Sequence, residues 1–134
     1  LDSPPANAWR GVSAPGLNED ILRWQFAADL AHGIGQSLLE SCVYDNQTGQ
    51  LLTGSLLDYC IPRADDLPSF TVSTRETPCP HNPLGVKGVG EVGTIGATPA
   101  VINAIVDALS ELGVTDVPMP ATPQTVWRAI QEAS

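Results

Sequence analysis

The chain has 134 residues, a length that predicts one compact domain and excludes an enzyme that holds several cofactors within this chain alone. Apolar residues make up 43% and charged residues 16%, so the chain is able to bury a core and does not resemble a disordered protein. Six Lys and Arg side chains against 15 Asp and Glu give a net charge of −9, which disfavours nucleic acid as a partner because phosphates require clustered cations.

Cysteine spacing and hydropathy predict the cellular compartment of the protein. Cys42, Cys60 and Cys79 lack the CxxC spacing of zinc and redox sites, so reduced thiols are expected. No uninterrupted apolar run approaches the ~18 residues of a membrane span, and the first residues show no signal-peptide pattern. These observations predict a cytoplasmic protein without a membrane partner.

The first elements expected along the chain are an irregular arm and a long helix. Residues 1–17 contain prolines without any periodicity, and Asn18 is a suitable N-cap. Apolar residues at four-residue spacing then predict a helix over 21–40. Gly33 and Gly35 lie inside this pattern, where each either breaks the helix or lets another backbone approach closely.

Two β elements are expected in the middle of the chain. Residues 42–53, with NQTG at their centre, predict a hairpin with a four-residue turn. Residues 70–74 alternate apolar and hydroxyl side chains, a pattern typical of a half-buried strand. Three prolines within 78–83 then exclude regular structure.

Two helices are expected near the C-terminus. Thr98 as N-cap and Pro99 at the first helical position predict a helix that Gly113 ends. A second Thr-Pro pair at 122–123 predicts a short helix in which Trp127 anchors the core. Together the elements predict an α+β fold of a long helix, a hairpin, a further strand, a glycine-rich loop and two C-terminal helices.

Residues 85–96 hold five of the 12 glycines. The segment GVGEVG at 88–93 matches the GxGxxG dinucleotide-binding pattern, but prolines precede it where that fold needs a buried strand, so this interpretation is weak. A second interpretation is a tight turn in which Glu91 is a carboxylate near a helix N-terminus. The only lysine of the chain, Lys87, lies in the same loop and argues for more than a turn.

Several further segments accompany this loop. They are HGIGQ at 32–36, DY and IPR within 58–63, ETP at 76–78, PLGVKGVGEVG at 83–93, and MPATP with VWRAI within 119–130. In this order they resemble the large subunit of the molybdenum hydroxylases, the family of xanthine dehydrogenase, aldehyde oxidase and aerobic carbon monoxide dehydrogenase. The resemblance implies that 29–134 form the C-terminal lobe of a molybdopterin-binding domain, preceded by a divergent arm and helix start at 1–28.

The resemblance also implies site residues. In that family molybdenum is held by the dithiolene of molybdopterin, often as the cytosine dinucleotide, and the matching glutamate is the general base. Glu91 would then take the proton of a metal-bound hydroxyl whose oxygen attacks an electron-poor carbon. Lys87, Gly88, Val89 and Gly90 would lie at the cofactor, with Lys87 supporting the loop or meeting an anionic cofactor group. No residue of this chain is expected to ligate the metal.

The same resemblance implies partners. Electrons would leave through 2Fe-2S clusters, usually to FAD, on other domains or subunits, and the remainder of the large subunit would complete the site. The chain alone is expected to bind no cofactor and to be inactive. The alternative is a non-catalytic remnant or interaction module of the same fold, which associates with itself through exposed apolar surface. The small-molecule substrate is not indicated by these residues.

Overall fold

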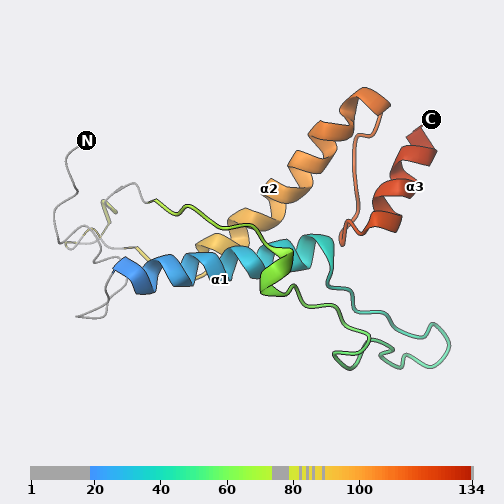
Figure 1. Ribbon diagram of the computed structural model, residues 1–134, viewed down its shortest axis with the longest axis horizontal. Coiled ribbons are helices and arrows are strands. Elements are labelled where there is room, and N and C mark those ends of the chain that lie inside the picture. Colours follow the sequence, from blue (N-terminus) through green and yellow to red (C-terminus); the bar gives the residue numbers. More distant parts are fainter. Residues whose placement is uncertain are drawn as a thin grey trace.

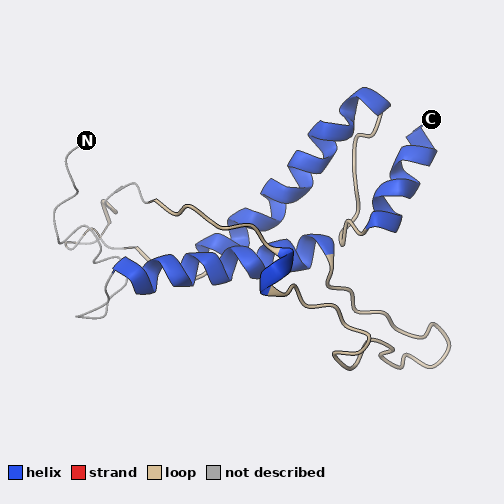
Figure 2. Ribbon diagram, viewed as in Figure 1, coloured by secondary structure: helices blue, strands red, loops and turns tan. Residues whose placement is uncertain are grey.

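The structure is a computed structural model that describes residues 19–73, 79–81, 83, 85, 87–88 and 90–133. These residues form three α-helices, α1 (Glu19–Leu38), α2 (Val92–Leu109) and α3 (Pro123–Ala133), and two short 3-10 helices, η1 (Ala64–Asp66) and η2 (Ser110–Leu112). The described part contains no strand (Figure 2). The fold is therefore mostly helical where it is described.

The helices diverge from a common contact. Figure 1 shows α2 running along α1 at its beginning and then away from it, with α3 beside the far half of α2. The loop that follows α1 extends away from the helices. The contact with α1 thus fixes the position of the start of α2.

α1 and α2 approach closely because glycine stands on both sides of their contact. A Cβ atom at Gly33 would lie 2.6 Å from Ala97 Cβ, and one at Gly93 would lie 2.5 Å from Asp29 Cβ. Thr94 Oγ1 also donates a hydrogen bond to the Asp29 carbonyl at 3.0 Å. Of the two alternatives for Gly33, close approach of another backbone is confirmed, and α1 continues past it.

The hydrophobic core lies between α2, α3 and the segment that joins them. Val114, Val117 and Ala121 of this segment are at most 5% exposed. Half-buried apolar side chains pack on them: Leu38, Ile102, Ile105, Val106, Leu109, Val126, Ala129 and Ile130. The Ala121 amide donates to the Ser37 carbonyl at 2.6 Å, so the end of α1 is attached to the same core.

The predicted hairpin is wrong as a pair of strands, although its turn is present. Asp45 accepts hydrogen bonds from the Thr48 amide at 2.7 Å and the Thr48 hydroxyl at 2.8 Å, and Gly49 has a φ of 71°. The backbone bridge between the arms is a single antiparallel one, Tyr44 with Leu51, and the Thr53 hydroxyl adds a hydrogen bond from the Val43 amide at 3.0 Å. Tyr44 is 56% exposed, and a two-stranded ribbon without a covered face is marginal in water.

The strand predicted over 70–74 is also wrong where it is described. Residues 70–73 have no regular structure, and Thr74 lies outside the described residues. A strand needs a neighbour for its backbone donors and acceptors, and none is present in the described ranges. The α+β class is therefore corrected to a mostly helical one for this part of the chain.

α2 begins well before the predicted Thr98-Pro99 cap, which lies inside the helix. The Thr98 hydroxyl caps nothing; it donates to the Thr94 carbonyl at 3.2 Å and to the Gly33 carbonyl at 3.4 Å. Packing of the first two turns of α2 on α1 outweighs the low helix propensity of the glycines there.

The ends of α2 and the start of α3 agree better with the prediction. Gly113 ends the helical stretch with a φ of 85°, and Thr122 Oγ1 accepts a hydrogen bond from the Thr125 amide at 3.2 Å as an N-cap. Trp127 is 61% exposed, so its predicted role as a core anchor is wrong. Val126 and Ile130 face the core in its place.

α2 exposes much of its apolar surface. Among the residues searched, the stretch 92–112 has a mean hydropathy of 1.5 and only 11% of its window buried, so by length and composition alone it is able to cross a membrane. Core helices of soluble proteins pass the same test. The search for uninterrupted apolar runs in the sequence does not find this stretch, because small and polar residues interrupt it. Its mean hydropathy is nevertheless high.

Candidate functional site

Glu91 stands at the N-cap position of α2, directly after the glycine-rich loop. Lys87, Gly88, Gly90 and Glu91 are all exposed, and Val89 lies outside the described residues. The Glu91 carbonyl accepts the Ile95 amide at 3.0 Å, but the Glu91 side chain makes no capping hydrogen bond. The helix therefore fixes the backbone of Glu91 without using its carboxylate.

The backbone on both sides of Glu91 contacts α1. Gln25 Nε2 donates to the Gly90 carbonyl at 3.3 Å and to Asp29 Oδ1 at 2.8 Å. Gly93 packs on α1 so closely that a Cβ there would lie 3.1 Å from the Phe26 carbonyl. Residues far apart in sequence thus position Glu91, and no sequence pattern indicated Gln25 or Asp29.

Two glycines of the loop are not explained by the described structure. Among the described glycines, positive φ angles occur at Gly49, Gly85 and Gly113, and not at Gly88 or Gly90. A Cβ at Gly88 or Gly90 would meet nothing within 4 Å. In the part of the chain that the structure describes, neither backbone conformation nor packing requires glycine at 88 and 90. The open space beside them fits a group that approaches the loop from outside the chain.

The described residues gather no set of three or more His, Cys, Asp or Glu that could hold a metal ion. His32 is exposed on α1. Cys42 and Cys60 are exposed, Cys79 is half-buried, and all three thiols are unpaired. Within the described ranges, these side chains by themselves do not form a metal centre.

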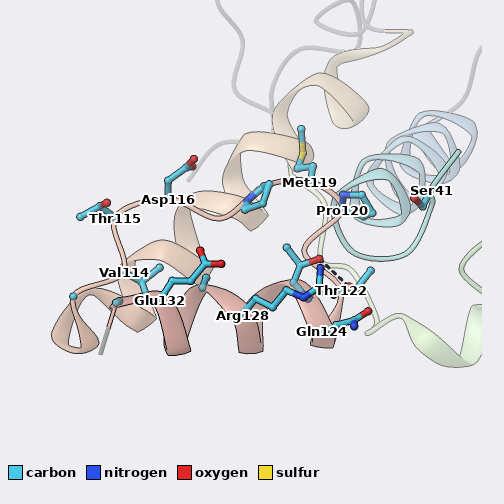
Figure 3. Close-up of a pocket in the computed structure, with 15 residues that line it drawn as sticks. Ser41, Val114, Thr115, Asp116, Met119, Pro120, Thr122, Gln124, Arg128 and Glu132 are labelled. Carbon is cyan, nitrogen blue, oxygen red and sulfur yellow. Dashed lines mark hydrogen bonds between the residues drawn. The ribbon is translucent and has the colours of Figure 1, made fainter. Parts of the chain in front are cut away.

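An open groove lies elsewhere on the molecule, between the segment 113–122 and α3 (Figure 3). Its volume is about 860 Å³, and its lining includes Asp116, Arg128 and Glu132. None of the described loop residues Lys87, Gly88, Gly90 and Glu91 lines it, so the groove and this part of the loop are separate features. The MPATP and VWRAI segments line part of it, but no pattern in the sequence predicts a groove.

Comparison with known sequences identifies the family. The Molybdopterin cofactor-binding domain family matches residues 15–68. The nicotine 6-hydroxylase large subunit of Paenarthrobacter nicotinovorans is 44% identical over 113 residues, which are 84% of this chain and 14% of that protein. The carbon monoxide dehydrogenase large chain of Hydrogenophaga pseudoflava is 35% identical over 116 residues, 87% of this chain and 14% of that protein. This chain belongs to the molybdenum hydroxylase large-subunit family.

Solved structures agree with this family. The crystal structure of quinoline 2-oxidoreductase from Pseudomonas putida 86 matches with a TM-score of 0.78 and 43% identity over 86% of this chain and 14% of that chain. A Cu,Mo-CO dehydrogenase matches with a TM-score of 0.80 and 30% identity over 87% of this chain and 14% of that chain. The chain spans about 14% of the length of the curated relatives it matches. The family resemblance is confirmed, while the roles of residues 87–91 and the boundary after residue 28 stay predictions.

Proposed function

We propose that this chain supplies Glu91 as the general base of a molybdenum hydroxylase, in a site completed by polypeptide outside these residues. The supporting observation is the glycine loop. Gly88 and Gly90 leave space that no described atom fills, directly before an exposed carboxylate whose backbone is fixed by α2 and α1. Because the matched segment is about 14% of each relative, most of the site surface lies in other polypeptide.

The residues of the loop have distinct tasks in this proposal. A bound molybdenum cofactor supplies the redox centre that takes electrons from the substrate. Gly88 and Gly90 bring backbone amides close to the cofactor because no Cβ intervenes. Lys87 supports the loop or meets an anionic cofactor group. Glu91 takes up, at a carboxylate oxygen, the proton that leaves the attacking oxygen nucleophile, a contribution of about 10²- to 10⁴-fold for a well-placed base.

The experiment that tests this proposal replaces Glu91 in the assembled enzyme. Glu91→Gln keeps the size of the side chain and removes the base, so turnover is expected to fall by about 10²-fold or more while molybdenum content persists. Glu111→Gln changes another exposed glutamate, in η2, and serves as the matched control. Near-normal turnover of Glu91→Gln would refute the assignment.

The exposed apolar surface supports a partner proposal. Ile95 in the first turn of α2 and Trp127 on α3 are 67% and 61% exposed, and large apolar side chains left in water favour a partner that covers them. We propose that the remainder of the large subunit covers this surface, and that iron–sulfur and FAD proteins remove the electrons.

The same surface favours a second candidate function, a self-associating module without activity. Co-expression of this chain with the rest of the large subunit separates the two functions. The catalytic proposal expects a complex that contains molybdenum and this chain. Homo-oligomers of this chain without molybdenum would instead establish the self-associating module.

A further inference from the structure

Asp29 is a buried carboxylate at the contact between α1 and α2. It is 4% exposed, its Oδ1 accepts a hydrogen bond from Gln25, and its Oδ2 has no hydrogen-bond partner. Burial of an incompletely bonded carboxylate opposes folding, so its presence in a small helical contact indicates a role beyond packing.

The Gln25 carboxamide joins this carboxylate to the glycine loop. One Nε2 hydrogen points to Asp29 Oδ1 at 2.8 Å and the other to the Gly90 carbonyl at 3.3 Å. A carboxylate and a carbonyl only accept hydrogen bonds, so the nitrogen of the carboxamide must face both of them. Gln25 and Asp29 lie one helical turn apart, which allows this pairing on α1.

We propose that Gln25 and Asp29 are positioning residues for Glu91, a role that rests on the proposed function of Glu91. Asp29 orients the Gln25 carboxamide, and the carboxamide holds the carbonyl of Gly90, the residue directly before Glu91. On the other side of Glu91, Gly93 packs against the Asp29 side chain itself. α1 thus holds the backbone on both sides of the catalytic carboxylate.

Variants of Gln25 in the assembled enzyme test the donor. Gln25→Ala removes both hydrogen bonds, and Gln25→Glu replaces the donor with a group that has no hydrogen when ionised. Both are expected to lower kcat by roughly 10- to 100-fold with little change in KM, the effect of a misplaced catalytic group. Gln131→Ala, which changes an exposed glutamine of α3, is the matched control and leaves kcat unchanged.

Variants of Asp29 test the acceptor. Asp29→Ala removes the acceptor and is expected to lower kcat as Gln25→Ala does. Asp29→Asn keeps an oxygen that accepts from Gln25, so its kcat is expected to stay near that of the unchanged enzyme. If Asp29→Asn lowers kcat as far as Asp29→Ala, the charge and not the hydrogen bond matters, and the positioning role is overturned.

The only lysine of this chain gives a readout that does not depend on turnover. A lysine-specific protease cleaves this chain after Lys87, and mass spectrometry of the released peptide identifies that cut within the assembled enzyme. Gln25→Ala and Asp29→Ala are expected to accelerate this cut several-fold because the loop opens more often. Asp29→Asn and Gln131→Ala are expected to leave it unchanged. Molybdenum content is measured on every variant.

The two readouts separate failure of this proposal from failure of the proposed function. An unchanged cleavage rate in Gln25→Ala would overturn the attachment of the loop to α1, whatever Glu91 does. Full turnover of Glu91→Gln would overturn the role of Glu91 and with it the positioning role, even where Gln25→Ala accelerates the cut.

Discussion

The glycines of the α1–α2 contact and the glycines of the loop before α2 have opposite surroundings. A Cβ at Gly33 or Gly93 would lie within 2.6 Å of a side-chain carbon of the facing helix. A Cβ at Gly88 or Gly90 would meet nothing within 4 Å. The first pair is explained by the fold of this chain, because only glycine permits that contact. The described part of the chain does not explain Gly88 and Gly90, so we connect them with a group from outside the chain.

The largest expected effect on stability comes from a substitution at Gly33, in the contact between α1 and α2. Gly33→Ala places a methyl group 2.6 Å from Ala97 Cβ and 2.8 Å from the Thr94 carbonyl, so α1 and α2 must separate. We expect the free energy of unfolding of the chain to fall by about 1–3 kcal/mol, measured by urea denaturation.

The matched control is Gly96, a glycine of α2 that does not contact α1. A Cβ at Gly96 would meet nothing within 4 Å, so Gly96→Ala is expected to raise the free energy of unfolding by about 0.5–1 kcal/mol through helix propensity. Equal effects of Gly33→Ala and Gly96→Ala would contradict the close contact between the helices.

A second prediction concerns the loop glycines. Gly88→Ala and Gly90→Ala add a methyl group to open space, so the free energy of unfolding of the chain is expected to change by less than about 0.5 kcal/mol. In the assembled enzyme the same methyl groups occupy the space assigned to the cofactor, and molybdenum content or turnover is expected to fall. A loss of chain stability, with the assembled enzyme unaffected, would show that these glycines serve the fold alone.

Local signals in the sequence predicted the helices well and the β elements poorly. The four-residue apolar spacing of α1, the Gly113 end and the Thr122 cap depend on neighbours along the chain, and the structure confirms them. The start of α2 depends on packing against α1, which is distant in sequence. The hydrogen bond between Thr94 and Asp29, for example, joins residues 65 positions apart. The hairpin depends on a covering layer that the described residues do not contain, so its turn forms without strands.

The candidate site also contains residues that a local motif indicated and residues that only a long-range contact reveals. The glycine loop and Glu91 were visible as a motif, and the family that the motif indicates is confirmed. Gln25 and Asp29 did not stand out in the sequence, because a polar pair one turn apart on a helix is common. Their meaning comes from the hydrogen bond between Gln25 and Gly90, which are 65 residues apart. Asp29 offered a weak signal, as an acidic residue between the apolar positions Phe26 and Leu30.

The smallest expected effect concerns a third region, the segment after α1, where a polar contact accompanies the close packing of Pro62 on Gly35 of α1. The Tyr59 hydroxyl donates a hydrogen bond to Glu40 Oε2 at 2.5 Å. Loss of the phenolic proton would break this bond and place two negative charges together, so the contact raises the pKa of Tyr59 from 10.0 to about 12.

The direction of the pH effect follows from that raised pKa. The contribution of the Tyr59–Glu40 bond to stability is complete below pH 10, the ordinary pKa, and is lost as the pH rises toward about 12. Tyr44→Phe leaves Tyr59 as the one tyrosine of the chain, so ultraviolet absorbance of tyrosinate reports its ionisation directly. In that background, Glu40→Gln is expected to return the pKa of Tyr59 toward 10.0, because a neutral amide no longer opposes the phenolate. Ionisation of Tyr59 near pH 10 with Glu40 intact would show that the hydrogen bond between Tyr59 and Glu40 does not form in solution.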